Sequence, residues 1–306
     1  MEYSFLFQHF FNFLMLGTIY ALVAVGFSLY FGVVDVVQFS HPDVMTLGGF
    51  AGLGGIVLVS ALGLTGNAFA LIAMLISAFV VVGIVGALIG RYLVLPLKGS
   101  SPINVLLITL MTGTAIREAL RIFVPGGSNP SPFPMVLPDA LVVVNGVSAR
   151  VSSLILLLIG ALAIIGTHLL LTRTRLGMAI RCVAQDEETS RFLGINFKRV
   201  VIITFVIGSC LGALAGIMSG LYYRQIIFNM GLMLGVIGFC SAVVGGLGSL
   251  LGAVLGGFLF SALQVLATVA LPIPSAYKDV FAFGAMILII AIRPTGLLRE
   301  RYQERV

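Results

Sequence analysis

The densest group of polar side chains in this chain interrupts a long apolar run, at FGVVDVVQFSHPDVMTLGGF (residues 31–50). The polar members that could contact a solute are Gln38, Ser40, His41 and Asp43. Pro42 disfavours helical geometry at His41, and backbone that is non-helical at membrane depth must be buried in protein or line a wet cavity. The segment therefore predicts a broken or re-entrant helix beside a translocation path. An interfacial turn with His41 as a hydrogen-bonded turn residue is the equally supported alternative.

A second polar group follows along the chain. Thr109 and Thr112 are two further candidates for the translocation path, and they precede three charged residues: Arg117, Glu118 and Arg121. Glu118 and Arg121 are spaced to pair on one helix face. Charge inside a membrane span indicates function by default, whereas an ion pair at the outer interface is the structural alternative.

Patterns for catalysis and metal binding are absent from the sequence. It contains neither GxSxG nor HExxH, its three histidines lack ligand spacing, and its three cysteines form no CxxC pair. We therefore expect no catalytic residue, no metal site and no enzyme activity in this chain.

The composition shows what must position these groups. The 306 residues are 59% hydrophobic and 9% charged, against about 25% charged in soluble domains. Residues 44–90 and 225–277 contain no Asp, Glu, Lys or Arg, and each stretch is long enough for two membrane helices of about 20 residues. A soluble enzyme, a DNA-binding protein and a secreted disulfide scaffold are excluded, and the first residues do not form a cleaved signal peptide.

The predicted fold is an all-α, polytopic bundle formed by residues 1–306 as a single transmembrane domain. Nine spans are expected, at Phe10–Val34, Val44–Leu62, Ala68–Ile89, Ile103–Val124, Val151–Leu171, Val200–Tyr222, Met230–Gly246, Leu250–Leu271 and Lys278–Ile292. An alternative with eight spans makes one early segment re-entrant and places the N-terminus inside.

Basic residues predict the orientation. Residues 90–101, 172–199 and 293–306 hold 12 of the 17 Lys and Arg side chains, which places all three segments in the cytoplasm; this charge reports orientation rather than a nucleic-acid partner. Nine spans then place the N-terminus and residues 125–150 outside. The proline-rich periplasmic segment 125–150 contains LVVV-NG-VSA, which predicts a hairpin with an Asn-Gly turn, either as a connector or as a contact for a partner.

Two rows of glycines recur every fourth residue. They are Gly208, Gly212, Gly216 and Gly220, and then Gly248, Gly252 and Gly256. In lipid, such faces let helix backbones approach closely. We expect packing inside the bundle, with a homo- or heterodimer face as the alternative.

The segment RTRLGMAIRCVAQDEETSRFLGINFKR (residues 173–199) has helical, amphipathic periodicity. It predicts one short helix between Gly177 and Gly194, with Asp186 in its middle and Gly194 in left-handed conformation at its end. Either the helix docks in a groove of a partner or it is a solvated surface helix.

This segment resembles the coupling loop of bacterial ABC importer permeases, in particular the branched-chain amino acid (Liv-type) permeases. The matching residues are Gly177, Ala179, Arg181, Ala184, Asp186, Leu193, Gly194, Ile195, Asn196, Arg199 and Val200. LGTIYALVAVGFSLYFGVV, FSHPD, TFVIG, GGLGSLLGAVLGG, YKDV and RPTGLL extend the resemblance over nearly the whole chain. Pro42 replaces a usual glycine of the family.

The resemblance implies import of branched-chain or related amino acids across the bacterial inner membrane by ATP-driven alternating access. It implies a second permease subunit, two cytoplasmic ATPases and a periplasmic binding protein, with residues 172–199 as the coupling loop. The residues implied in ATPase coupling are Gly177, Ala179, Arg181, Ala184, Asp186, Glu187 and Gly194. Since the chain has no Gly-Lys dipeptide and hence no Walker A motif, ATP and Mg would bind the partner ATPases. A secondary transporter or channel for a small polar solute such as urea or amides is the alternative.

Overall fold

The computed structural model describes residues 2–63, 66–144, 147–271 and 274–298. Its helices are α1 (Glu2–Val34), α2 (His41–Ala61), α3 (Asn67–Leu88), α4 (Pro102–Phe123), α5 (Val151–Arg173), α6 (Arg175–Gln185), α7 (Glu187–Phe192), α8 (Phe197–Tyr223), α9 (Met230–Gly245), α10 (Leu250–Val269) and α11 (Lys278–Ile292). A π-helical segment η1 (Ile89–Val94) continues α3, and a 3₁₀ turn η2 (Ser275–Tyr277) precedes α11.

The nine predicted spans correspond to nine of these helices, with ends that differ by a few residues. Within the described residues, eight helices are long and apolar enough to cross a membrane, and α9 is a shorter apolar helix. The largest differences are at α1, which begins before Phe10, and at the third span, which η1 extends to Val94. Prolines in the first turns of α2 and α4 suit helix starts, where the missing N–H has no intrahelical partner.

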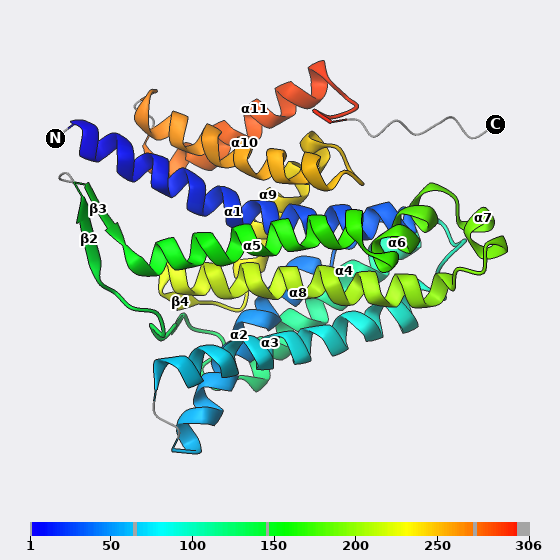
Figure 1. The fold of residues 1–306 in the computed structure, drawn as a ribbon, viewed down its shortest axis with the longest axis horizontal. Helices are drawn as coiled ribbons and strands as arrows, with labels where there is room; N and C mark the ends of the chain where they lie inside the picture. The colour runs from blue at the N-terminus through cyan, green and yellow to red at the C-terminus, as the bar shows by residue number, and fades with distance from the viewer. Residues whose placement is uncertain (1, 64–65, 145–146, 272–273, 299–306) are drawn as a thin grey trace.

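Helices α1 and α8 form the centre of the bundle. Helix α1 contacts α5, α8, α9 and α10, whereas α8 also contacts α2 and α3 (Figure 1). Helix α4 packs outside α2, and α11 packs outside α10. Peripheral helices α3, α4, α5 and α11 expose large apolar side chains, as expected for surfaces that face lipid rather than water.

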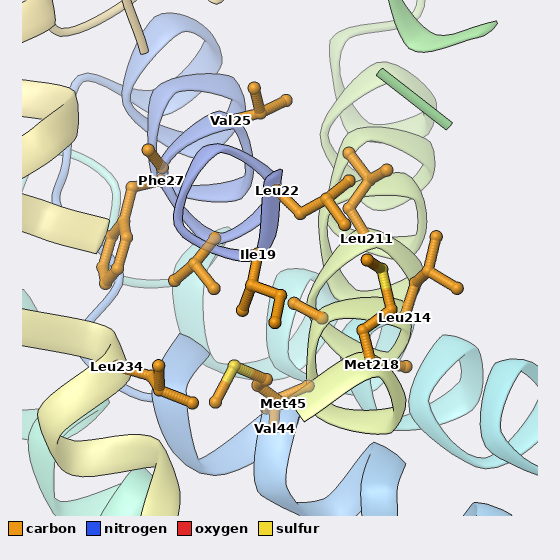
Figure 2. Close-up of a cluster of buried hydrophobic side chains, with 14 of the residues drawn as sticks. Ile19, Leu22, Val25, Phe27, Val44, Met45, Leu211, Leu214, Met218 and Leu234 are labelled. Carbon is orange, nitrogen blue, oxygen red and sulfur yellow. The ribbon is translucent and has the colours of Figure 1, made fainter. Parts of the chain in front are cut away.

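The buried core joins the early and late halves of the chain. Figure 2 shows Ile19 and Leu22 of α1 beside Met45 of α2 and Leu211 of α8, with Leu234 of α9 pointing into the same cluster. All five side chains are buried. Because these helices are far apart in sequence, the core depends on the whole bundle rather than on one hairpin of neighbouring helices.

The two ends of the bundle differ. The first turns of α1 lie at the end that carries the β-hairpin, which we call the hairpin end; α6, α7 and the last described residues lie at the opposite end (Figure 1). The N-terminal part of α1 is therefore at the end opposite to α6 and α7, an arrangement that the nine-span model expects, while the number of spans and their sidedness stay a prediction. The basic positions Arg299, Arg301 and Arg305 lie outside the described residues.

Short strands are confined to the hairpin end. Strand β2 (Leu141–Val144) pairs antiparallel with β3 (Val147–Arg150), with Val144 opposite Val147. This confirms the predicted hairpin, whose turn residues Asn145 and Gly146 lie outside the described residues. Strands β1 (Ser131–Pro132) and β4 (Gln225–Ile226) pair with each other, which joins the segment before the hairpin to the end of α8.

Candidate translocation and coupling sites

The predicted break between the first two spans is present at residues 35–40, where α1 has ended and α2 has not begun. Asp35 has a φ of 55° and its N–H still donates to Phe31 O at 2.9 Å, so it ends α1 in left-handed conformation. Helix α2 then begins at His41, with Pro42 in its first turn. The expectation that Pro42 keeps His41 out of a helix is wrong, because a proline in the first turn initiates the helix instead.

The polar side chains of the break are buried together. Their members are Gln38, Ser40, His41 and Asp43, and Thr109 of α4 joins them; we call these five residues the break cluster. Gln38 Nε2 donates to Ser40 Oγ at 2.6 Å, and the Phe39 N–H donates to Thr109 Oγ1 at 3.4 Å. Thr112 is half-buried and bonds only to Ile108 O of its own helix. The translocation role of these residues stays a prediction.

His41 lies deep in the bundle rather than at an interface. Its ring packs edge-on against Phe27 and Tyr30, with ring centroids 5.0 and 5.2 Å away. Gly26 and Gly212 lie on its other sides, where a Cβ atom would collide with the imidazole. Among the described residues, neither ring nitrogen of His41 makes a hydrogen bond of good geometry, although the Val23 backbone lies beside the ring; the alternative of a hydrogen-bonded turn histidine stays open.

Helix α4 provides the countercharge for the break. Asp43 lies 3.7 Å from the Arg117 guanidinium, and Arg117 also donates to Thr114 Oγ1 at 3.1 Å. The predicted pair of Glu118 and Arg121 is present at 3.1 Å. The sequence grouped Arg117 with Glu118 and missed its partner Asp43, because a contact between helices 74 positions apart has no local sequence signal.

Helix α9 begins beside the first turn of α2. A Cβ at Gly231 would collide with Pro42 O and Thr46 Oγ1, and one at Gly235 would collide with the Pro42 ring. The two helix starts therefore meet inside the bundle. Helices that start at membrane depth are typical of transporter binding regions.

The first glycine row packs inside the chain. Gly208 faces Tyr30, Gly212 faces His41, Gly216 faces Met45 O, and Gly220 faces Phe133. In the second row, Gly252 and Gly256 face the backbone of α9 at Gly245 and Ser241. Gly248 does not belong to this helix face, because it precedes α10 and has a φ of 89°. The four-residue spacing correctly predicted a packing face at Gly252 and Gly256, but the spacing alone could not show that Gly248 lies in the turn before α10.

Residues 175–192 form two helices rather than the one predicted. Asp186 is the N-cap of α7, and its Oδ1 accepts hydrogen bonds from the N–H groups of Glu188 at 2.9 Å and Thr189 at 3.3 Å. A carboxylate in this position satisfies otherwise unpaired N–H groups. Asp186 therefore shapes the segment and does not lie in the middle of a helix. Gly194 has a φ of 81°, as predicted.

The apolar side of α6 packs against its own bundle. Gly177, Ile180 and Val183 are buried, and α6 contacts α1, α5 and α8. Gly177 does not bracket the helix but lies in its first turn, where a Cβ would collide with Leu170 and Leu171. Ala179 and Ala184 are half-buried on this side, so part of it stays open, and their role in ATPase coupling stays a prediction.

Ion pairs hold α7 against the loop after η1. Lys98 pairs with Glu187, and Arg191 Nη2 pairs with Glu187 Oε1 at 2.6 Å. The Lys98 ammonium also lies 3.6 Å from the centre of the Phe197 ring. Partial burial and the nearby Arg191 guanidinium lower the pKa of Lys98 to about 8, so it is still mostly protonated at neutral pH. Glu187 is therefore engaged within the chain.

The exposed end of α7 includes Phe192, which sequence reasoning did not single out, and Leu193, which it matched to the family without giving it a coupling role. Phe192 and Leu193 are 92% and 72% exposed; we call this pair the α7 tip. Arg181 is also exposed, and no ion pair within the described residues involves it. The signal for the tip was available, because two large apolar residues next to Gly194 interrupt a charged segment.

A cavity of about 220 Å³ lies between α1, α8, α9, α10 and α11, and we call it the hairpin-end cavity. Its polar lining includes Tyr20, Gln264, Lys278 and Asp279. The Tyr20 hydroxyl donates to Gln264 Oε1 at 3.1 Å, and Gln264 Nε2 donates to Asp279 Oδ1 at 2.5 Å. None of the residues predicted for the translocation path lines this cavity. The overlooked signals were Gln264 within a charge-free apolar run and Asp279 at the start of α11.

Comparison with known proteins identifies the relatives of the chain. It is 31% identical to BraD of Pseudomonas aeruginosa, a high-affinity branched-chain amino acid transport system permease protein, over 98% of this chain and 97% of BraD. It is 29% identical to LivH of Escherichia coli K12, a permease protein with the same description, over 100% of this chain and 99% of LivH. A probable branched-chain amino acid transport permease protein, LivM of Methanocaldococcus jannaschii, is 26% identical over 92% of this chain and 91% of its own length. Since residues 9–290 also match the family described as "Branched-chain amino acid transport system / permease component", the chain belongs to this permease family.

Proposed function

We propose that the chain is a permease subunit of a binding-protein-dependent ABC importer that moves branched-chain or related amino acids across the bacterial inner membrane. The observation that carries this proposal is the end-to-end similarity to permeases of high-affinity branched-chain amino acid systems. The hairpin end then faces the periplasm, and the end with α6 and α7 faces the cytoplasm.

The proposed complex contains a second, LivM-type permease subunit, two cytoplasmic ATPases and a periplasmic binding protein. The similarity of this chain to both LivH and LivM proteins supports pairing between two related permeases. ATP and Mg bind the ATPase subunits, and their closure moves α6 and α7. Because α6 packs against α1, α5 and α8, movement of the segment is transmitted directly to the centre of the bundle, which supports alternating access.

The transport test uses proteoliposomes that contain the complete complex. Uptake of labelled leucine should require the binding protein, and it should require ATP on the side of the membrane where the ATPases lie. It should stop when the ATPase is inactivated. Flux through the permease without a working ATPase would contradict the proposal and favour a secondary transporter or channel.

The α7 tip is the proposed anchor for the ATPase. A large apolar side chain that becomes buried at the centre of an interface contributes about 2 kcal/mol or more, which corresponds to a Kd change of about 30-fold. Phe192→Ala should therefore reduce copurification of the ATPase and abolish substrate-stimulated ATP hydrolysis. Phe123→Ala is a matched control, because Phe123 is 81% exposed at the other end of the bundle. Equal ATPase binding in both variants would show that the α7 tip is not part of the interface with the ATPase.

Gly194 holds the tip in position. A β-branched residue is strained at its φ of 81°, so Gly194→Val should displace Phe192 and Leu193 without disturbing the buried side of α6. The variant should insert and fold, yet bind the ATPase more weakly. Ala184→Arg would test internal packing as well as any partner contact, because Ala184 lies half-buried on the side of α6 that packs against the permease itself.

A further inference from the structure

The hairpin-end cavity carries two opposite charges side by side. Lys278 and Asp279 form the start of α11, and both line the cavity. Asp279 Oδ1 accepts the hydrogen bond from Gln264, but no ion pair within the described residues involves either charged side chain. Both side chains are only half-buried, so their charges are available to a solute in the cavity.

The polar wall of the cavity is held in a fixed geometry. Gln264 is buried and links the Tyr20 hydroxyl to the Asp279 carboxylate by hydrogen bonds through its oxygen and its nitrogen. Because both ends of the amide are bonded, the orientation of Gln264 is set and Asp279 is directed by it. A carboxylate positioned by buried groups is prepared to bind a cation without further ordering.

Part of the cavity lining is apolar. Met233, Leu234 and Ile237 of α9 form this part, and Leu234 also packs into the core shown in Figure 2. The volume of about 220 Å³ lies below the roughly 300–1,000 Å³ of pockets for drug-sized ligands. The cavity therefore suits one small solute that has opposite charges at one end and an aliphatic group at the other.

We propose that the hairpin-end cavity is a binding site for a zwitterionic aliphatic amino acid within the permease itself, with Asp279 facing the ammonium group, Lys278 facing the carboxylate and α9 facing the side chain. This inference rests on the proposed function and extends it, because it places part of the substrate selectivity in the permease rather than entirely in the binding protein. The cavity lies where α8 ends at the hairpin end, which is the end from which an imported solute arrives.

The test measures leucine uptake, basal ATPase activity and yield of the complete complex for Asp279→Asn. Losing a charge-assisted hydrogen bond should lower kcat/KM for leucine about 10- to 100-fold, while complex yield and basal ATP hydrolysis stay at the wild-type level. Asp279→Glu should restore part of the transport. Asp139→Asn is the matched control, because Asp139 is an exposed carboxylate at the same end that pairs with Arg224 at 2.7 Å.

A second variant covers the case in which Asp279→Asn fails to assemble. Lys278→Gln removes the other charge at a half-buried position, and it should weaken leucine transport to a similar extent. Met233→Trp places a larger side chain in the apolar part of the lining and makes the cavity smaller. It should lower the ratio of leucine to alanine transport about tenfold, since a pocket discriminates between solutes that differ by one methylene group by about that factor.

The outcomes separate the site from the proposed function. Wild-type kcat/KM for leucine in both charge variants would overturn the site while ATP-dependent uptake still supports the importer. Parallel loss of transport, basal ATPase activity and complex yield in both variants would also overturn it, since the residues would then be structural. Absence of ATP-dependent leucine uptake in the wild-type complex would overturn the proposed function itself.

Discussion

The break cluster and the hairpin-end cavity are both polar groups inside an apolar bundle, but they are built differently. The break cluster is filled: the His41 ring is enclosed by Gly26, Phe27, Tyr30 and Gly212. The cavity is hollow, and Gln264 is hydrogen-bonded at both ends. The break cluster, which is the more conspicuous motif in the sequence, is thus closely packed in this conformation. The cavity is lined by side chains that are inconspicuous in the sequence.

The difference indicates separate roles for the two regions. The break cluster is tightly packed where α2 and α9 begin beside each other, since a Cβ at Gly231 or Gly235 would collide with the first turn of α2. The cavity contains charges that a solute can satisfy. We infer that the break fixes the positions of α2 and α9, and that α9 in turn forms one wall of the solute space.

The largest expected effect comes from filling the glycine contact beneath the break. Gly216→Leu would place side-chain atoms against Met45 O, which is backbone and cannot rotate away. Overpacking costs about 1–3 kcal/mol where side chains can adjust and more where, as here, the opposing atom is backbone, so the yield of folded, membrane-inserted protein should fall strongly in a detergent extraction and gel-filtration assay.

Gly166→Leu is the matched control for that variant, because a Cβ at Gly166 meets nothing within 4 Å. It should give wild-type yield. If both variants accumulate equally well, the close approach of α8 to α2 is not needed for the fold, and the break cannot be what positions α9.

Removing the charge of the break should have the next largest effect. Asp43→Asn leaves Arg117 without its carboxylate partner in a mostly buried place, where the two side chains are 5% and 17% exposed. Loss of one member of a buried pair costs on the order of 3 kcal/mol, so the unfolding midpoint temperature should fall clearly. Glu118→Gln breaks an exposed pair and should cost about 1 kcal/mol or less. Equal midpoints would show that the break cluster is hydrated.

The sequence predicted the helices well because a long apolar run in lipid has to form a helix, and a local signal such as Gly194 marks the end of one. It predicted less at places where a choice depends on distant partners. Asp186 could be a mid-helix residue or an N-cap, and only the packing of α6 against α1 and α8 decides this. The pair of Asp43 with Arg117 and the cavity around Gln264 depend in the same way on contacts between distant helices.

Cysteine accessibility sharpens the comparison directly. In a background with Cys182, Cys210 and Cys240 replaced by alanine, Met233→Cys should react with a small aqueous thiol reagent at least about tenfold faster than Ser40→Cys, because reactivity follows exposure. Met233 is 46% exposed in the cavity lining, and Ser40 is fully buried. The rates are measured on the complete complex with and without trapped ATP.

The effect of trapped ATP decides the predicted translocation role of the break. An increase in the rate at Ser40→Cys upon ATP trapping would place the break cluster on the path in another state of the transport cycle. Inertness in both states would make it a structural element. Equal rates at the two positions without ATP would contradict the contrast between a filled cluster and an open cavity.

The smallest effect separates Thr109 from Thr112, the two threonines predicted for the path. Thr109 is buried and accepts the Phe39 N–H of the break at 3.4 Å, whereas Thr112 bonds only within its own helix. Thr109→Val leaves that N–H without its partner and should cost about 1 kcal/mol, seen as a drop of a few degrees in the unfolding midpoint. Thr112→Val should change the midpoint very little. If instead Thr112→Val lowers leucine uptake at an unchanged midpoint while Thr109→Val does not, the solute passes along α4 at Thr112, and the break cluster is only its support.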